Sequence, residues 1–328
     1  MPTVCFAPIW YPVDDYATSR LRAKYVVDLL AGDDLWDVGL DYRADADIAV
    51  IVQLCSNSNF EKISNNRDQL VVYDVCDRFF ATDRTFQTDE GVLYTRSRCL
   101  ETIERADALI APTPQLRDEI SRLFPAKPCF NIPEAVDYGA SPQPVTKAGS
   151  RRLVWFGHTT RGNFESSQWI IDHLMARHGY RPVLVTTPNT LVRRYPAYAE
   201  FCVPWSPGNV RQELAAAELC LVSHAPQEPG KSPNRFVTAT MQGVPTLVSG
   251  SPSCLELLEA AGYGDFAVET PLDVDRVVHS LSDPAQRTAY VTALQKEMWR
   301  RHSPGAVADA YRELFRNVWS GIGDDPTY

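Results

Sequence analysis

A lysine and an arginine stand close together where a strand-like run of the sequence meets a helix-like run. Residues 223–245 read SHAPQEPGKSPNRFVTATMQGVP, and this segment contains Lys231, Ser232, Asn234 and Arg235. The first turn of a helix presents backbone N–H groups without partners, and two cations beside it suit an anion such as a phosphate. The segment therefore predicts phosphate binding. The alternative is a solvated loop capped by a serine.

A glycine follows a second strand-like run and could bring the backbone close to the same ligand. Gly157 comes directly after the apolar run 152–156, and Arg161 lies four residues further on. Glycine has no side chain to keep a ligand away, although it is also common in plain turns. The chain contains neither the glycine-rich dinucleotide fingerprint nor a P-loop motif, which counts against both kinds of site.

Acidic residues follow strand-like runs in the first half of the chain. A carboxylate at such a place could orient a reacting hydroxyl group. Our candidates for contact with a second substrate are Asp14, Asp15, Arg20, Asp74 and Asp77. The alternatives are plain solvated acids and, for Asp77, a structural ion pair with Arg78.

Composition limits the class of protein. The chain has 328 residues, of which 45% are hydrophobic, and a net charge of −9, which fits a soluble protein of two domains. The negative charge disfavours a general binder of nucleic acid or anionic membrane. It leaves open a local basic stripe formed by Arg20, Arg22, Lys24, Arg96 and Arg98. No apolar run reaches the ~20 residues of a membrane span, and we expect a cytoplasmic protein.

Cysteine and histidine spacing gives no sign of a metal site. The eight cysteines form no CxxC pair and mostly lie in apolar runs, so we expect buried free thiols. His173 and His178 are five residues apart, which is the wrong step for one helix face. We therefore expect no metal and no bound cofactor.

The elements that must position these residues alternate between strands and helices. In the first half we expect strands at 4–7, 47–54, 70–75, 108–111 and 129–132, with helices at 19–30, 97–105 and 114–124. In the second half we expect strands at 152–156, 183–186, 201–203, 219–223, 246–248 and 266–268. The helices there are at 166–178, 210–217, 235–242, 255–261, 274–281, 283–301 and 304–318.

This alternation predicts two Rossmann-like α/β domains with parallel sheets that face a cleft. We place the first domain at 1–140, a linker rich in glycine, serine and proline at 141–151, and the second domain at 152–303. A final helix and tail occupy 304–328. Strand carboxyl ends and helix N-termini of both halves are expected to point to the cleft.

The order of several short motifs resembles the GT-B glycosyltransferases, in particular the group 1, family 4-like set. Gly157-His158 after a strand and K-S-x-N-R before a helix ending in G-V-P resemble the C-terminal half of that family. In the first half, SRLR at 19–22, VVYDVCD at 71–77, ADALI at 106–110 and IPEAVD at 132–137 resemble further family segments.

The resemblance implies that the second half binds a nucleoside diphosphate sugar and the first half an acceptor. Lys231 and Arg235, with Gly157, Arg161, Ser232 and Asn234, would hold the diphosphate. Trp205 lies where family members hold the nucleobase, and Trp205 and Thr238 are the residues expected to contact the nucleoside. The last helix would cross back to the first domain.

Three features depart from the family pattern. Gly230 and Thr238 stand where the family carries its E-x7-E glutamates, which puts the ribose contact in doubt, and Glu228 is out of register. Residues 1–157 contain no histidine, and the first half is short.

The function implied is transfer of a sugar to an acceptor hydroxyl, retaining and without a metal. Lys231 and Arg235 would stabilise the leaving diphosphate, and Asp14 or Asp77 would act on the acceptor. The acceptor could be a saccharide, a lipid-linked saccharide, a small natural product or a hydroxylated base in DNA, and a homo-oligomer is left open. Two alternatives are a catalytically inactive nucleotide-sugar-binding subunit and a GT-B-shaped epimerase that uses His158, His224 and Glu228.

Overall fold

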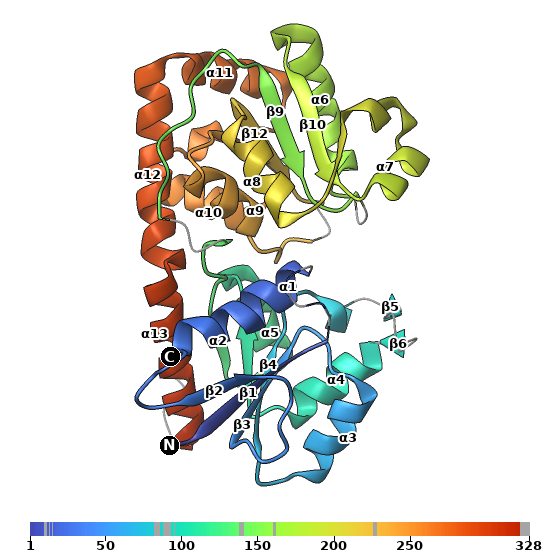
Figure 1. Cartoon of the computed structure of the whole chain (residues 1–328), viewed down its shortest axis with the longest axis vertical. Helices are drawn as coiled ribbons and strands as arrows, with labels where there is room; N and C mark the ends of the chain where they lie inside the picture. Colours follow the sequence, from blue (N-terminus) through green and yellow to red (C-terminus); the bar gives the residue numbers. More distant parts are fainter. Residues whose placement is uncertain are drawn as a thin grey trace. The chain divides into compact units, whose positions relative to one another are not determined.

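The chain divides into two units, each with its own sheet and core. We describe a computed structural model in which residues 1–9, 12, 14, 16–81, 86–87, 93–94, 96–137, 141–159, 162–225 and 228–321 are placed. Unit 1 comprises Met1–Ala135 and Pro304–Tyr328, and unit 2 comprises Val136–Ser303. The fold within each unit can be followed in Figure 1.

Unit 1 is built on a six-stranded parallel sheet. Its strand order is β2-β1-β3-β4-β7-β8, so the chain starts inside the sheet, adds one strand on one side and then continues on the other. The strands are β1 (Thr3–Pro8), β2 (Asp37–Leu40), β3 (Ile48–Val52), β4 (Leu70–Asp74), β7 (Ala108–Ala111) and β8 (Cys129–Asn131). A separate antiparallel pair joins β5 (Phe86–Gln87) and β6 (Leu93–Tyr94). The direction of building reverses between β1 and β3, which makes their carboxyl ends the switch point of this sheet.

The helices of unit 1 cover both faces of this sheet. They are α1 (Ala17–Ser19), α2 (Tyr25–Leu30), α3 (Asn57–Asn65), α4 (Arg96–Arg105), α5 (Pro114–Leu123) and α13 (Pro304–Trp319), with a short 3-10 turn at Phe79–Ala81. A π-helical stretch, Arg20–Lys24, joins α1 to α2 and buries four successive residues, Arg20 to Ala23. The wider π turn explains why a charged residue, Arg22, lies on the inner side of what the sequence indicates as one amphipathic helix.

The C-terminal helix α13 belongs to unit 1 although it comes last in the chain. Its apolar face packs into the core of the first sheet, where the ring of Tyr311 lies 5.7 Å from that of Phe6 and the ring of Phe315 lies 5.5 Å from that of Trp36. This confirms the predicted return of the last helix to the first domain.

Unit 2 is built on a five-stranded parallel sheet with strand order β11-β10-β9-β12-β13. The strands are β9 (Arg152–Phe156), β10 (Arg181–Thr186), β11 (Cys202–Pro204), β12 (Leu219–Ser223) and β13 (Thr246–Ser249). The chain adds β10 and β11 on one side of β9 and then crosses to add β12 and β13 on the other. The switch point of this sheet therefore lies between the carboxyl ends of β9 and β12.

The helices of unit 2 begin in a recurrent way. They are α6 (Glu165–His178), α7 (Pro188–Arg194), α8 (Pro207–Ala215), α9 (Asn234–Met241), α10 (Pro252–Ala260), α11 (Pro271–Ser282) and α12 (Pro284–His302), with 3-10 turns at Pro196–Phe201 and Gly264–Phe266. Five of them have proline in the first turn, where its missing N–H costs nothing and its fixed φ favours the helix. Thr270 and Asp273 form a capping box at the start of α11.

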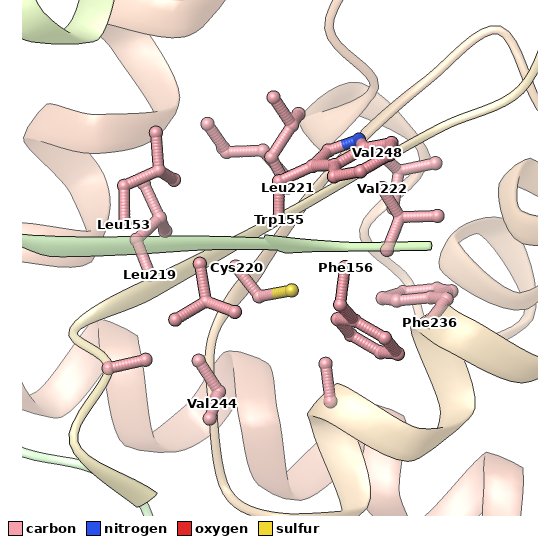
Figure 2. Packing of buried hydrophobic residues seen from close by; sticks show 14 of the residues in the cluster. Leu153, Trp155, Phe156, Leu219, Cys220, Leu221, Val222, Phe236, Val244 and Val248 are labelled. Carbon is pink, nitrogen blue, oxygen red and sulfur yellow. The ribbon is translucent and has the colours of Figure 1, made fainter. Parts of the chain in front are cut away.

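The core of unit 2 lies on both faces of its sheet. Figure 2 shows Trp155 and Phe156 on opposite sides of β9, with Phe236 of α9 on the side of Phe156. Trp155 and Phe236 are fully buried. Successive side chains of a strand point to opposite faces, so the unbroken apolar run RLVWF suits a strand with helices on both sides.

The segment that follows unit 1 is held against the end of α9. The N–H groups of Gln143 and Thr146 donate to the carbonyls of Met241 and Gly243, both at 2.9 Å. Gly243 has φ +80°, and a Cβ there would lie 2.0 Å from the carbonyl oxygen of Pro144. The glycine of the G-V-P motif is thus required by its backbone conformation and by the close approach of residues 143–146.

The structure confirms the predicted fold class and corrects several elements. The strand predicted at 266–268 is wrong: the 3-10 turn Gly264–Phe266 leads into a single bridge between Val248 and Ala267. A tight turn leaves no room for a ladder, because its residues are hydrogen-bonded locally. Three short elements were not predicted: β2, α3 and α7, with four, nine and seven residues.

Candidate functional site

An arginine lies across the switch point of the second sheet. Arg235, in the first turn of α9, donates from Nη1 to the carbonyl of Phe156 at 3.1 Å and from Nη2 to the carbonyl of Ser223 at 2.7 Å. Phe156 ends β9 and Ser223 ends β12. The guanidinium group therefore joins the carboxyl ends of the two strands between which open α/β sheets place their ligands.

Gly157 gives this guanidinium its space. The residue has φ +143°, and a Cβ there would lie 3.0 Å from Nη1 of Arg235. Its own N–H donates to the carbonyl of Val185 at 3.1 Å. The structure thus brings together two residues, Gly157 and Arg235, that the sequence analysis assigned to one phosphate site.

The guanidinium group of Arg235 is held in place by uncharged carbonyl groups. Burial lowers its pKa, and weaker effects of Cys254, Cys220 and Glu228 raise it. A guanidinium group stays protonated in proteins, and its carbonyl partners do not cancel its charge. The group also lies 5.9 Å from the centre of the Trp155 ring. Its positive charge is therefore available to an anion at this edge of the sheet.

Lys231 contacts an acidic neighbour. Its Nζ lies 3.6 Å from Oε2 of Glu228, and both side chains are about three-quarters buried or more, with exposures of 24% and 19%. The Lys231 carbonyl accepts a hydrogen bond of 2.6 Å from Ser253. The side chain of Ser232 accepts from the N–H of Asn234, the first residue of α9, at 3.3 Å. Lys231, Ser232 and Asn234 are thus the residues that lead directly into the helix carrying Arg235.

A neutral histidine lies beside the two cations. His224 follows β12, is 1% exposed, and its Nδ1 lies 2.6 Å from the hydroxyl of Ser251. Burial lowers its pKa well below the usual value, and Arg235 and Lys231 lower it further. His224 is therefore uncharged at neutral pH. The histidine places one more polar group at this edge without adding charge.

The loops after β9 and β12 are tied together by Asn163, which the sequence analysis missed. Its side-chain carbonyl accepts from the N–H of Ala225 at 3.2 Å. Its backbone carbonyl accepts from the hydroxyls of Ser167 and Ser223 at 3.0 and 2.9 Å. The only signal in the sequence is a polar residue in the loop after Gly157. Arg161, assigned to the same phosphate site, lies outside the described residues.

The two residues expected to contact the nucleoside lie in different surroundings. Trp205 follows β11, and its backbone N–H donates to the carbonyl of Thr186 at 2.9 Å. Its partly buried ring packs against the core. Parallel strands end on one edge, so Trp205 lies on the same edge of the sheet as Gly157. Thr238 lies in the interior of α9 and is 5% exposed.

In unit 1, one of the expected acceptor residues is enclosed. Asp74 ends β4, has no exposed surface, and its Oδ2 accepts from Nε of Arg22 at 2.7 Å. Burial is the largest single influence on the pKa of Arg22 and would lower it, but the Asp74 carboxylate together with Tyr311, Glu134 and Cys76 raises it well above the usual value. Arg22 also donates to the carbonyl of Ile132 at 2.6 Å. The carboxylate of Asp74 holds Arg22 and presents nothing to a substrate in this conformation.

The other expected acceptor residues lie nearer the surface. Asp14 is exposed and lies 2.7 Å from Nζ of Lys24, and its carbonyl accepts from Nη1 of Arg20 at 2.8 Å. Asp77 follows β4 and is half-buried, while its neighbour Arg78 makes a two-pronged pair with Glu119 at 2.7 and 2.6 Å. Asp15 lies outside the described residues.

Two of the five residues in the basic stripe considered for DNA lie inside unit 1. Arg20 and Arg22 are 5% and 1% exposed, because the π-helical stretch turns both inward. Arg96 donates to the carbonyl of Phe80, and Arg98 pairs with Glu101 and lies over the ring of Phe60. Lys24 and Arg98 are half-buried and Arg96 is exposed, so the surface part of the stripe is limited to these three residues.

Sequence reasoning missed Gln53, which lies at the switch point of the first sheet. It follows β3 directly, is buried, and has φ +67°, a conformation that non-glycine residues adopt rarely. Its carbonyl accepts from the hydroxyl of Tyr73 and its N–H donates to the carbonyl of Asp74, both at 2.9 Å. Strained backbone of this kind gathers at binding sites, which makes Gln53 a candidate for the acceptor side.

The structure also corrects the interpretation of two histidines. His173 and His178, both on α6, were expected to point apart, yet their Nε2 atoms lie 2.7 and 2.6 Å from the same Oδ1 of Asp275 on α11. The two imidazoles reach the same carboxylate oxygen because Asp275 belongs to another helix, α11, and lies between them. These contacts hold the pKa of Asp275 below its usual value. The eight cysteines are free, six of them buried and Cys129 and Cys202 half-buried.

Comparison with known proteins finds likeness in structure alone. No family model and no curated protein matches the sequence. The structure is similar to HepE from Anabaena in complex with UDP-glucose, with a TM-score of 0.66, 12% identity and coverage of 96% of this chain and 99% of HepE. It is also similar to an α-glucosyltransferase in complex with UDP and a 13-mer DNA containing an HMU base, with a TM-score of 0.62, 11% identity and coverage of 97% and 99%.

A third similar structure is TarM from S. aureus, with a TM-score of 0.60 and 11% identity. The match covers 82% of this chain, which spans 55% of the length of TarM. Among the described residues, every helix falls short of the length or the apolar character that a membrane-crossing segment needs. Taken together with the two parallel sheets, these likenesses show that the chain has the GT-B fold of solved glycosyltransferases.

Proposed function

We propose that the protein transfers a sugar from a nucleoside diphosphate sugar to an acceptor hydroxyl group. The observation that carries the proposal is the position of Arg235, whose guanidinium joins the ends of β9 and β12 beside Gly157 at the switch point of the second sheet. A cation there, at the start of a helix, suits a diphosphate. The GT-B fold supports the same reaction class, and the UDP and UDP-glucose bound in two of the similar structures make UDP the first nucleotide to test.

The proposed role of the cations is to stabilise the leaving group. As the bond between the sugar carbon C1 and the phosphate oxygen breaks, the sugar becomes oxocarbenium-like and negative charge grows on the diphosphate. Arg235, Lys231 and the first N–H groups of α9 offer positive charge where this negative charge develops. Losing one such group in other enzymes costs about 2–4 kcal/mol of transition-state stabilisation. This charge supply explains how the reaction could proceed without a metal.

Lys231 would exchange partners when the donor binds. Its Nζ lies 3.6 Å from Glu228, and Oε2 of Glu228 is buried without a hydrogen-bond partner. An arriving diphosphate carries more charge than one carboxylate and would attract the lysine. Glu228 would then be free to accept a hydrogen bond from a sugar hydroxyl. Lys231 would thus bind the diphosphate and Glu228 the sugar of the same donor.

The stereochemical outcome rests on the family resemblance. In a retaining reaction by front-face attack, the acceptor oxygen bonds to C1 on the side from which the diphosphate leaves. The acceptor proton passes to the leaving phosphate oxygen, so no protein base is required. Asp14, Asp15 and Asp77 are proposed to orient the acceptor. Asp74 is left out of this set because its carboxylate is enclosed with Arg22.

The first experiment measures binding of UDP, GDP, ADP, CMP and dTDP by thermal shift and calorimetry. We expect one nucleoside diphosphate to bind clearly better than the others. Lys231→Ala should weaken that binding at least tenfold, because one cation near the diphosphate is lost. The matched control is Lys296→Ala, which removes an exposed lysine of α12 in the same unit. Equal binding by the two variants, or no response to any nucleotide, would overturn the phosphate assignment.

A second experiment tests transfer itself. The nucleotide sugar with the preferred base is incubated with saccharide, lipid-linked saccharide, small hydroxylated compounds and an oligonucleotide carrying a hydroxymethylated base. Transfer yields a glycosylated acceptor and free nucleoside diphosphate in equal amounts. A new nucleotide-sugar isomer without acceptor would indicate the epimerase, and tight binding without turnover on any acceptor would indicate the inactive binding subunit.

A further inference from the structure

Two imidazoles and one carboxylate converge on the surface of unit 2, away from the proposed donor site. His173 and His178 of α6 and Asp275 of α11 offer three ligand atoms that all lie within 4.8 Å of one another. All three residues are partly exposed, with side-chain exposures of 17%, 20% and 36%. A solvent ion can therefore reach them. In the described part of the chain this is the one group of at least three such residues with this spacing.

The geometry is close to that of a tetrahedral metal site. Zn–N and Zn–O bonds of about 2.0–2.2 Å place ligand atoms about 3.3–3.6 Å apart in a tetrahedron. The two Nε2–Oδ1 distances are 2.7 and 2.6 Å, which are hydrogen-bond distances. An ion would enter if these atoms separated by about 0.6–1.0 Å, a small movement for partly exposed side chains. Water would complete the coordination.

The donor set also selects the kind of ion. Imidazole nitrogen suits zinc and neighbouring transition metals, whereas Mg²⁺ and Ca²⁺ are bound through oxygen. Two histidines with one carboxylate occur as a zinc ligand set in proteins. We propose that His173, His178 and Asp275 form a Zn²⁺ site that clamps α6 to α11.

The position of the site indicates a structural role. α6 starts after the carboxyl end of β9 and ends at His178, just before β10 begins. At 1.5 Å per residue, the 14-residue helix places its two ends about 20 Å apart. The zinc site thus lies toward the amino edge of the sheet, opposite the edge that carries Gly157. An ion there would fix two helices and would not touch the reacting groups.

The test measures zinc binding by the whole protein after treatment with a chelator and removal of that chelator. We expect one Zn²⁺ per chain by calorimetry and elemental analysis, and a melting temperature raised by at least about 3 °C at saturation. Co²⁺ in place of zinc should give the visible absorption of a tetrahedral site with nitrogen and oxygen ligands. A wild-type chain that takes up no stoichiometric zinc would overturn the proposal.

Variants identify the ligands. Asp275→Asn keeps the shape of the side chain but weakens its metal affinity, and His173→Ala removes one imidazole. Each should weaken zinc binding at least about 100-fold and abolish the thermal shift. The matched control is His279→Ala, an exposed histidine one turn further along α11 and outside the three-atom group. It should bind zinc like the wild type.

Two outcomes would count against this ligand set. Zinc binding that survives Asp275→Asn would point to the free cysteines, and loss of binding in His279→Ala would point to a different cluster. If His173→Ala does not fold, the Asp275→Asn variant and the Co²⁺ spectrum of the wild type still decide the matter. Nucleotide binding is measured in parallel, so a failure here is separate from a failure of the proposed sugar transfer.

Discussion

Each sheet of the protein has an arginine at the carboxyl end of its strands, and the two arginines have opposite surroundings. In unit 1, Arg22 is fully buried and pairs with Asp74 at 2.7 Å. In unit 2, Arg235 donates to the carbonyls of Phe156 and Ser223, which carry no net charge. Burial tends to lower the pKa of both arginines. Asp74 and the neighbouring Tyr311, Glu134 and Cys76 together reverse this for Arg22, whereas the pKa of Arg235 stays lowered.

The difference indicates what each arginine is for. A buried arginine paired with a carboxylate is neutral as a pair and serves the fold. An arginine held by dipoles keeps its full charge, and the strand ends fix its position before a ligand arrives. Unit 2 therefore has the features of an anion site at its switch point. In unit 1 the charge of Arg22 is already paired with Asp74 within the core.

The largest effect is expected when the pair of unit 1 is broken. Asp74→Ala should lower the free energy of unfolding by about 3–5 kcal/mol, because it removes the carboxylate that is hydrogen-bonded to the buried Arg22 guanidinium. Urea denaturation measures the change. The control, Asp309→Ala, removes an exposed carboxylate that pairs with Arg312 in the same unit and should change stability little. Equal effects of the two variants would show that burial does not distinguish these pairs.

Removing the Arg235 side chain of unit 2 should reduce the rate of catalysis more than the stability of the fold. Arg235→Ala is expected to reduce sugar transfer about 30- to 1,000-fold, which corresponds to 2–4 kcal/mol of transition-state stabilisation. Arg235→Lys should lie between wild type and alanine, because it keeps the charge but loses the two-pronged contact. Steady-state kinetics on folded protein measures this. The control, Arg181→Ala, removes an exposed arginine at the start of β10 and should leave kcat/KM unchanged.

The contrast between the two arginines could be predicted only in part from the sequence. Gly157 and Arg235 were assigned to one site because a glycine after a strand and a cation at a helix start are both local signals. Asp74 was misjudged because its position after a strand looks the same whether the carboxylate faces solvent or a buried arginine. The π-helical stretch adds one residue to a helical turn and thereby turns Arg22 inward. The spacing of apolar residues in the sequence does not reveal this extra residue.

Long-range contacts explain the other misses. The alternation of strands and helices and the apolar runs of the strands are local patterns, so the fold class could be predicted from the sequence. His173 and His178 looked unrelated because their meeting point, Asp275, lies about 100 residues later on another helix. Gln53 gave no signal because a positive φ at a non-glycine residue is imposed by its surroundings. Most of what single stretches encode was predicted, apart from β2, α3, α7 and the stretch 266–268, whereas what distant stretches impose on one another was not.

The position of α9, which carries Arg235, should depend on the glycine at its other end. Gly243→Ala is expected to cost about 2 kcal/mol or more, because the new Cβ would meet the carbonyl of Pro144 and the backbone has a positive φ. The control, Gly179→Ala, has a positive φ but open space around it and should cost about 1 kcal/mol. Thermal and urea unfolding give the two values. Nucleotide affinity should fall only in Gly243→Ala, and equal affinities would mean that the end of α9 does not position Arg235.

The cationic character of unit 2 should also be visible in the pH dependence of its stability. Burial, Arg235 and Lys231 together depress the pKa of His224 in the folded state well below its ordinary value of 6.5. Below pH 6.5 the unfolded chain therefore takes up a proton that the folded chain excludes, and stability falls by up to about 1.4 kcal/mol per pH unit. Above pH 6.5 His224 is neutral in both states and adds nothing to the pH dependence of stability.

The variant His224→Asn tests this. It keeps a polar atom near Ser251 but cannot titrate, so the difference in unfolding free energy between wild type and variant should change with pH below 6.5 and stay constant above it. Urea titrations between pH 5 and 8 measure this difference, and parallel curves at all pH values would mean that His224 is not held neutral in the folded state.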